Sequence, residues 1–425
     1  MDSRRRRVKW LGAAGVLVAL LVGGAAQIGT GAGSVAGQAS AAETILRTGG
    51  PASQPPAIRR LGTATATSVS DDAAVVGVLA DLGIFWAERL PKDFGRPLPP
   101  LVGGYVSIDA TAPTGSTWCV GKPEQIAGNA YYCPDGDAIV YDSAGLVPVL
   151  LGHYGVAGLT AAFAHEFGHA IQARIGPTEA QRTAQPARYP SILIEAQGDC
   201  FAGAFLAWAV AGNSPHVRLP PSSMVRAVAP LLDFRDPPDV RVDDASAHGL
   251  GLDRLTSILR GYHGGAKACA VLTAAALKST LGRPGVSVAL VPRYARPADV
   301  TAAARKSVGA FTGALPGRRA LDLATVVPAA ADHAAAGPFG QFAEAAALAL
   351  AAGRAITSTP AGAACFTGAW TASVFGHAAP GALGSRAGDA DEALDMLRAR
   401  SAATFDELTG YADGFAGGWP ACAAR

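Results

Sequence analysis

The sequence has few charged residues, and no long basic run follows its first nine positions. Only 16% of its 425 residues are Asp, Glu, Lys or Arg, and the formal net charge is +2. A nucleic-acid-binding surface needs a basic patch or stripe, so nucleic acid is disfavoured as a partner. Half of the residues are hydrophobic. That is enough to build a sizeable core, and the length favours two or three domains.

The chain also lacks a second long apolar run. The first run covers 10–26, follows basic residues from Arg4 to Lys9, and precedes any further charge until Glu43. This order predicts a secretory signal or a single membrane anchor over 1–41, with the rest of the chain extracytoplasmic, either secreted or membrane-anchored. No Cys directly follows the run, which disfavours a lipoprotein. A single candidate span disfavours an intramembrane protease.

Cysteines are few but even in number. In an exported chain an even count favours disulfides, here three, over free buried thiols. The six are Cys119, Cys133, Cys200, Cys269, Cys365 and Cys422.

The most informative stretch is an HExxH sequence at His165–His169. Residues 159–175 contain no proline and Gly176-Pro177 follows, which predicts a helix that ends there. Four residues apart on a helix, His165 and His169 share a face and could bind one Zn²⁺. Glu166 lies beside that face, where a carboxylate can act as the general base for a metalloprotease. The alternative is a buried helix with hydrogen-bonded histidines.

A second pair of residues favours the metal interpretation. Glu195 and Asp199 are also four apart, in an otherwise apolar segment. Carboxylates are rarely buried without a partner. We therefore expect Glu195 to be the third zinc ligand, and Asp199 to accept the free N–H of a ligand histidine, His165, behind it.

These motifs together resemble the neutral zinc metallopeptidase family. The matching stretches are 165–172 (HEFGHAIQ), 195–204 (EAQGDCFAGA) and His248-Gly249 with Arg254 and Gly261. The resemblance covers roughly 68–277 and departs at Gly198, where the family commonly has Ala. It implies a gluzincin-like peptidase with one zinc per chain, bound by His165, His169 and Glu195. A metzincin is disfavoured, because its third histidine would fall at Ile175.

The order of elements favours an α+β, mainly helical fold. A zincin-like catalytic domain over 68–281, with a small sheet and the HExxH helix, would follow a linker over 42–67. A mostly helical, degenerate and non-catalytic repeat would cover 288–425. Nothing after the N-terminal run looks membrane-spanning.

Around the HExxH helix, local patterns predict several elements. A helix should run from Asp71 to about Leu90 and end at Pro91, and strands should cover 101–108 and 138–142. The strand at 138–142 could be an edge strand that pairs with an extended substrate, or an ordinary structural strand. After the HExxH helix we expect a polar loop over 176–190, a helix over 191–211, and a helix over 252–262 that ends at Gly264-Gly265.

The second half of the chain resembles a degenerate copy of the first. Residues 200–207 (CFAGAFLA) are echoed by 365–372 (CFTGAWTA), and 261–269 (GYHGGAKAC) by 414–422 (GFAGGWPAC). The matches are in Cys, Gly and aromatic residues, which favours duplication over coincidence in an Ala-rich sequence. Disulfides are then expected within each copy: Cys200–Cys269, Cys365–Cys422, and Cys119 with Cys133.

Aligning the copies removes the proposed zinc chemistry from the second. Matching Phe163-Ala164 to Phe342-Ala343 sets Glu344, Ala345 and Leu348 opposite His165, Glu166 and His169. Matching the cysteines sets Pro360 opposite Glu195, and Ala364 opposite Asp199. The second copy is therefore expected to fold without binding zinc.

The function that we expect is hydrolysis of a peptide bond in a peptide or protein substrate, with Glu166 as general base. The oxyanion needs a further donor. His248 is the first candidate, ahead of Arg254 and Tyr141, although it could also be an ordinary histidine near a helix start. Two alternatives remain: a non-catalytic cell-surface binding protein, and a zinc amidase that acts on a non-peptide or cell-wall amide.

Overall fold

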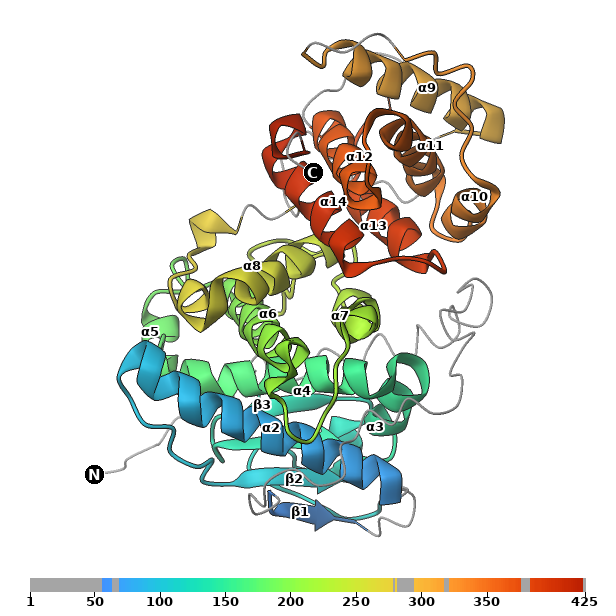
Figure 1. Cartoon of the computed structure of the whole chain (residues 1–425). Coiled ribbons are helices and arrows are strands. Elements are labelled where there is room, and N and C mark those ends of the chain that lie inside the picture. Colours follow the sequence, from blue (N-terminus) through green and yellow to red (C-terminus); the bar gives the residue numbers. More distant parts are fainter. Residues whose placement is uncertain are drawn as a thin grey trace, which may run out of the picture.

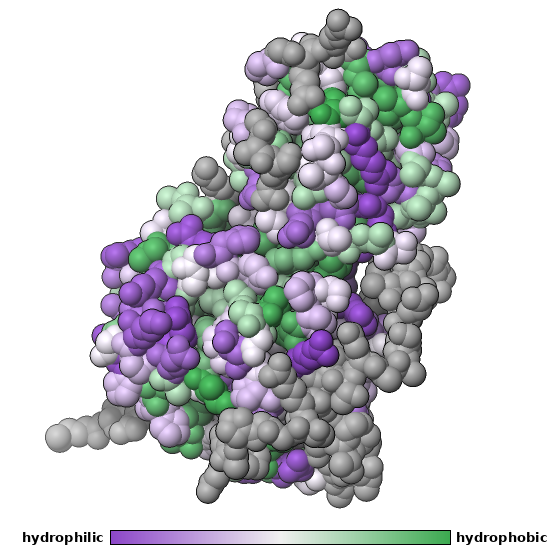
Figure 2. All heavy atoms as spheres, viewed as in Figure 1, coloured by the Kyte–Doolittle hydropathy of each residue, from purple (hydrophilic) through white to green (hydrophobic). Residues whose placement is uncertain are grey.

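The computed structural model describes residues 56–62, 69–277, 280, 294–316, 321–375 and 383–422 (Figure 1). The signal or anchor expected over 1–41 lies outside these residues. The described part is mainly helical with one small sheet, as the sequence predicts. Hydrophilic and hydrophobic residues are interspersed on the face seen in Figure 2. We call the described residues of 56–277 the first half and those of 294–422 the second half.

A four-stranded sheet forms one side of the first half. Its strands are β1 (Ile58–Leu61), β2 (Gly104–Ile108), β3 (Ala130–Cys133) and β4 (Ala138–Asp142), in the order β1-β2-β4-β3. The first three in that order are parallel, and β3 is antiparallel to β4. The linker expected over 42–67 is therefore wrong at 58–61, which pair with β2.

Strand β4 has the predicted bounds but not an edge position, because β2 and β3 flank it. It is buried on both faces. Ile139 and Tyr141 point into the main core, whereas Ala138 and Val140 join a smaller core on the other side. A strand buried on both faces has a continuous apolar run, which explains the sequence of this one. Substrate pairing along β4 is thus excluded, and β3 is the nearest edge.

Helix α2 (Val69–Phe94) is longer than predicted at both ends. Asp71 lies inside its first turn. Pro91 does not end the helix, which continues to Phe94. The amide of Gly95 then closes the last turn on the Pro91 carbonyl. Trp86 and Phe85 from this helix pack in the main core.

The helix that carries the HExxH sequence is α4 (Gly155–Ile175), and it lies against β3 and β4. Helices α2, α6 (Ser191–Trp208) and α7 (Met224–Asp233) also contact it. The segment Leu146–Ile175 is long and apolar enough to span a membrane by length and composition, contrary to our expectation for this part of the chain. Its contacts in the core account for that composition equally well.

Short elements connect these helices. The loop expected over 176–190 contains one of them, α5, which the Thr178 side chain caps. Helix α5 covers Glu179–Ala184. The other short elements before α8 are η1 (Pro123–Ile126), α3 (Leu146–Val149), η2 (Leu150–Tyr154), η3 (Ala209–Asn213) and η4 (Pro221–Ser223).

Helix α8 (Gly251–Ala270) packs against α6 with almost no space between the two backbones. A Cβ on Gly261 would lie 1.7 Å from the Cys200 carbonyl oxygen, and one on Gly203 would lie 2.0 Å from the Ile258 carbonyl oxygen. Only glycine permits this approach. The helix does not end at Gly264-Gly265 as expected. It continues through a kink at Gly265, where φ is 68°.

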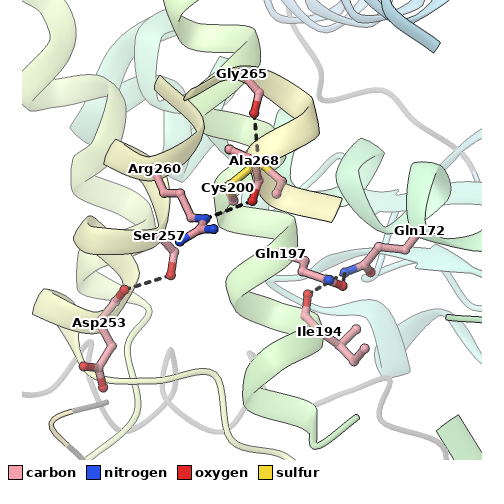
Figure 3. Close-up of a disulfide and its surroundings, with 10 residues drawn as sticks. Gln172, Ile194, Gln197, Cys200, Asp253, Ser257, Arg260, Gly265 and Ala268 are labelled. Atoms are coloured by element: carbon pink, nitrogen blue, oxygen red, sulfur yellow. Dashed lines mark hydrogen bonds between the residues drawn. A yellow bond between two sulfur atoms is a disulfide. The ribbon is translucent and has the colours of Figure 1, made fainter. Parts of the chain in front are cut away.

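All three predicted disulfides are present: Cys119–Cys133, Cys200–Cys269 and Cys365–Cys422. The second bridge joins α6 to α8, and Figure 3 shows its surroundings. The described residues include no free cysteine. Three bridges indicate an oxidising, extracytoplasmic environment.

The elements formed by the described residues of the second half are all helices. Helix α14 lies beside α12, as α8 lies beside α6 (Figure 1). The elements are α9 (Pro297–Gly313), α10 (Ala330–Ala336), α11 (Gln341–Ile356), α12 (Pro360–Val374), α13 (Asp389–Ala399), α14 (Phe405–Gly417) and η6 (Trp419–Cys422), preceded by η5 (Ala274–Ala276).

The same close helix contacts occur in both halves. A Cβ on Gly414 would lie 2.0 Å from the Cys365 carbonyl oxygen, and one on Gly368 would lie 2.0 Å from the Tyr411 carbonyl oxygen. These contacts match those of Gly261 and Gly203. The pair α12 and α14, with its disulfide, therefore repeats the geometry of α6 and α8.

The contacts correct our alignment of the HExxH helix with the second half. A Cβ on Gly168 would meet Gly198 and Phe201, and one on Gly353 would meet Ala363 and Phe366, which are the corresponding residues of α12. Gly353 thus occupies the place of Gly168, six residues from the Ala347 that our alignment puts there. Spacing alone could not show this, because the loop between the two helices is shorter in the second half. The residues at the positions of His165, Glu166 and His169 are Leu350, Ala351 and Arg354.

Charged residues occupy that region of the second half. Arg354 binds Asp332, and Asp332 also accepts from Arg400 Nε at 2.9 Å. Arg400 in turn lies 2.7 Å from Glu407, which stands at the position of Arg254. Two arginines and two carboxylates thus form an ion network where the first half has its histidine cluster.

Candidate metal centre

Helices α4 and α6 bring the three predicted ligands together. His165 Nε2 lies 3.1 Å from His169 Nε2 and 3.2 Å from Glu195 Oε2, and His169 Nε2 lies 3.6 Å from the same oxygen. Among the described residues, these three form a group of side chains that could hold a metal ion. Ligand atoms about 2.0–2.1 Å from a tetrahedral metal are separated by roughly 3.3 Å, which these distances match.

The opposite nitrogen of His165 is bound to Asp199, as expected from the sequence. Nδ1 lies 2.7 Å from Asp199 Oδ1. Arg254 in α8 donates to both oxygens of the same carboxylate, at 2.8 and 2.9 Å, and donates to the Phe234 carbonyl at 2.9 Å. Because an ionised carboxylate only accepts, His165 carries its proton on Nδ1 and directs the lone pair of Nε2 at the cluster.

His169 is held in the same way by Gln172. Its Nδ1 lies 2.8 Å from Gln172 Oε1. The amide nitrogen of Gln172 donates to the Ile194 carbonyl at 2.7 Å and to Gln197 at 3.1 Å (Figure 3). These two bonds fix which end of the amide faces the ring, so Nδ1 is the donor and Nε2 again presents a lone pair.

The cluster therefore fits a cation. Two Nε2 lone pairs and one carboxylate oxygen converge within 3.6 Å, and each imidazole proton is already used on the far side of its ring. Such an arrangement is repulsive unless a positive charge, either a metal ion or a proton on His165 Nε2, lies between the three atoms. The surrounding carboxylates favour that positive charge. Burial alone would lower the pKa of His165, but Asp199 and Glu195 outweigh it and raise the pKa to about 10, so that without a metal ion His165 would hold the charge as a second proton.

Gly168 and Gly198 allow the two ligand helices to approach. A Cβ on Gly168 would lie 3.1 Å from the Gly198 carbonyl oxygen, and one on Gly198 would lie 3.1 Å from Cε1 of both His165 and His169. The imidazole rings thus rest on the Gly198 backbone. An alanine at position 198 would press on both rings.

Glu166 lies at the free edge of the sheet. Its Oε2 accepts from the backbone amide of Tyr132 in β3 at 3.1 Å. In an antiparallel pair, alternate residues direct their N–H and C=O groups toward the partner strand and away from it. The Asp142 amide donates to the Asn129 carbonyl, so residue 129 faces β4. The Tyr132 amide, three residues further along, therefore points away from β4. The next outward amide, that of Ala130, is bound by the Asn129 side chain at 2.8 Å. Both outward N–H groups of β3 are therefore already bonded, which leaves carbonyls for a pairing peptide.

His248 lies at the side of the cluster. Its Nε2 is 3.8 Å from Glu195 Oε2, and its Nδ1 is 3.6 Å from Asp236. Asp236 also accepts from the backbone amides of His248 and Gly249, at 2.6 and 2.7 Å. His248 is thus anchored near the expected reaction centre.

The two other candidate donors have different surroundings. Arg254 is 2% exposed and bound to Asp199, and Tyr141 is buried with its ring 5.2 Å from that of Phe163. Arg254 therefore fixes the Asp199 carboxylate, on the side of His165 that faces away from the cluster. Tyr141 packs in the core.

Burial and neighbouring charges set the protonation of the carboxylates. Burial raises the pKa of Glu166, although His165 and His169 oppose the shift. Burial acts the same way on Asp199 and Glu195, but there the neighbouring basic side chains prevail. Arg254 and His165 hold the pKa of Asp199 below its usual range, and His169 and His248 hold that of Glu195 well below.

Sequence reasoning gave no role to Gln172, Asp236 or Tyr132. The first could have been found, because a residue three positions after His169 lies on the same helical face. Asp236 and Tyr132 reach the site through long-range folding, with no local signal. No family model, curated protein or solved structure matches the chain.

Proposed function

We propose that this protein is an extracytoplasmic zinc-dependent peptidase, related in its motifs to the neutral zinc metallopeptidases. The observation that supports this most is the convergence of His165, His169 and Glu195 with Glu166 beside them. Nitrogen and carboxylate donors suit Zn²⁺. Three ligands leave a position open, and a purely structural zinc site would be closed and would need no general base.

Each residue then has a definite task. A zinc ion held by the three ligands would polarise the scissile carbonyl and lower the pKa of the attacking water. Glu166 would take the proton of that water and deliver it to the leaving amine. His248, anchored by Asp236, would donate to the oxygen that becomes negative in the transition state. Asp199 and Gln172 would keep the ligand histidines in the required tautomers.

Metal analysis of the purified extracytoplasmic part tests the ligand set. We expect about one zinc per chain, and His169→Ala should lose most of it. His153→Ala is the matched control, since this exposed histidine lies in η2, outside the cluster. A wild-type zinc content in His169→Ala would refute the ligand assignment.

A digest of a peptide library tests the reaction. Hydrolysis should stop with chelator, and Glu166→Gln should retain zinc while losing at least about a hundredfold in kcat. Hydrolysis of cell-wall fragments but not peptides would favour the amidase alternative. A Glu166→Gln variant that cleaves at the wild-type rate would remove Glu166 from the mechanism.

A further inference from the structure

The turn that carries His248 is attached to the second half of the chain. Helix α8 begins at Gly251, three residues after His248, and the preceding Leu250 has no side-chain oxygen to cap it. The first two amides of the helix instead donate to Asp391 in α13, from Gly251 at 2.7 Å and from Leu252 at 2.9 Å. A carboxylate at a helix N-terminus is favourable because it binds these unpaired amides.

The Asp391 carboxylate also holds the chain segment at Arg235 and Asp236, which packs against the turn. Arg235 Nε lies 3.3 Å from Asp391 Oδ2, and the Arg235 guanidinium also forms two bonds to Asp395, at 2.7 and 3.1 Å. The next residue, Asp236, binds the amides of His248 and Gly249. Asp391 therefore lies between the two chain segments that fix the position of His248.

The contact is buried and close. Asp391 is 2% exposed, and a Cβ on Gly251 would lie 3.2 Å from its Oδ2. Two backbone amides and one arginine leave the carboxylate little freedom to move. The turn on the other side is accordingly held at a fixed distance from α13.

We infer that Asp391, from the half of the chain without the histidine cluster, is a positioning residue for His248. The inference rests on the proposed function, because it assigns Asp391 a task in the same reaction. The two halves meet at α7, α8, α13 and α14, and Asp391 lies in this interface. The second half would then position His248 in the active site by binding the backbone amides at the start of α8.

The test compares Asp391→Ala with Asp332→Ala in the full extracytoplasmic part. Both residues are 2% exposed carboxylates of the second half, but Asp332 pairs with Arg354 and Arg400. We expect Asp391→Ala to lower kcat by about tenfold or more, with KM and zinc content within about twofold of wild type. Asp332→Ala should leave kcat within about twofold. Rates are compared below the unfolding temperature of every variant.

Repeating the measurement in a His248→Ala background separates positioning from general destabilisation. If Asp391 acts through His248, Asp391→Ala should have little further effect there. An equal loss of kcat with and without His248 would overturn the inference, as would an equal loss in Asp332→Ala. Asp391→Asn, which keeps one oxygen acceptor, should show an intermediate kcat and provides a variant if Asp391→Ala does not fold.

Hydrogen exchange gives a readout that needs no activity. The amides of 248–252 should exchange faster in Asp391→Ala and stay unchanged in Asp332→Ala. If the wild-type protein hydrolyses no peptide, the proposed function fails, whereas the exchange data still decide whether Asp391 orders the turn. Unchanged exchange in Asp391→Ala would overturn the inference regardless of activity.

Discussion

Asp199 and Gln172 hold His165 and His169 by their Nδ1 atoms, but with different charges. Asp199 is fully buried, ionised and bound twice by Arg254. Gln172 is neutral and bonded to Ile194 and Gln197. Replacing Asp199 would therefore leave a buried arginine without its carboxylate, whereas replacing Gln172 leaves only neutral groups.

This difference predicts two sizes of effect. Gln172→Ala should weaken zinc binding by about tenfold, because His169 loses the partner of its Nδ1 proton. Asp199→Asn should weaken it further, and should also lower the free energy of unfolding by about 3 kcal/mol. Competition with a chelating dye measures the first quantity and denaturant titration the second.

Gln185→Ala, at an exposed position after α5, is the control. Zinc affinity in Gln172→Ala equal to that of wild type would show that His169 does not depend on Gln172.

Among the elements, the glycine contacts between paired helices are the most demanding feature. Gly261 and Gly414 each face a carbonyl oxygen of the partner helix at 2.0 Å or less from an ideal Cβ. No side-chain rotation can relieve such a clash, because both sides are backbone. The helices must separate, and with them the disulfide that joins each pair.

Alanine substitutions should show this as overpacking. Gly261→Ala and Gly414→Ala are each expected to lower the free energy of unfolding by about 3 kcal/mol, at the upper end of overpacking effects. Gly83→Ala in α2, where no atom lies within 4 Å of the new Cβ, should be neutral or stabilising by up to about 1 kcal/mol. Chemical denaturation checks all three, and equal effects at positions 83 and 261 would contradict the steric argument.

Elements with strong local patterns were predictable from the sequence. The bounds of β4 follow from an apolar run after a turn, and the ligand helices follow from four-residue spacings. Strand β1 was missed because its four residues, two of them arginines, gain their order only by pairing with β2 more than 40 residues away. The clustering of His165, His169 and Glu195 was predictable from spacing, whereas Asp236 and Tyr132 reach the site only through the folded chain.

At the scale of the whole molecule, the disulfides tie together long stretches of chain. The bridges Cys200–Cys269 and Cys365–Cys422 span 69 and 57 residues. By the chain-entropy model, whose basis is disputed, each should contribute about 4 kcal/mol to the free energy of unfolding. Cys365→Ser with Cys422→Ser should therefore lower the midpoint of chemical denaturation markedly. Cys119→Ser with Cys133→Ser, which opens a separation of 14, should lower it less. The reverse order would contradict the loop-length argument.

The ion network of the second half has a consequence for how the two halves respond to metal depletion. The first half gathers donor atoms that could hold a diffusible metal ion, whereas the second half has cations covalently attached as Arg354 and Arg400. A chelator should therefore loosen α4 and α6, with faster amide exchange there, and leave α11 and α12 unchanged. Equally faster amide exchange in both helix pairs would show that the two halves unfold as one cooperative unit. Selective loosening would mean that the local stability of the first half depends on the concentration of free metal, whereas that of the second half does not.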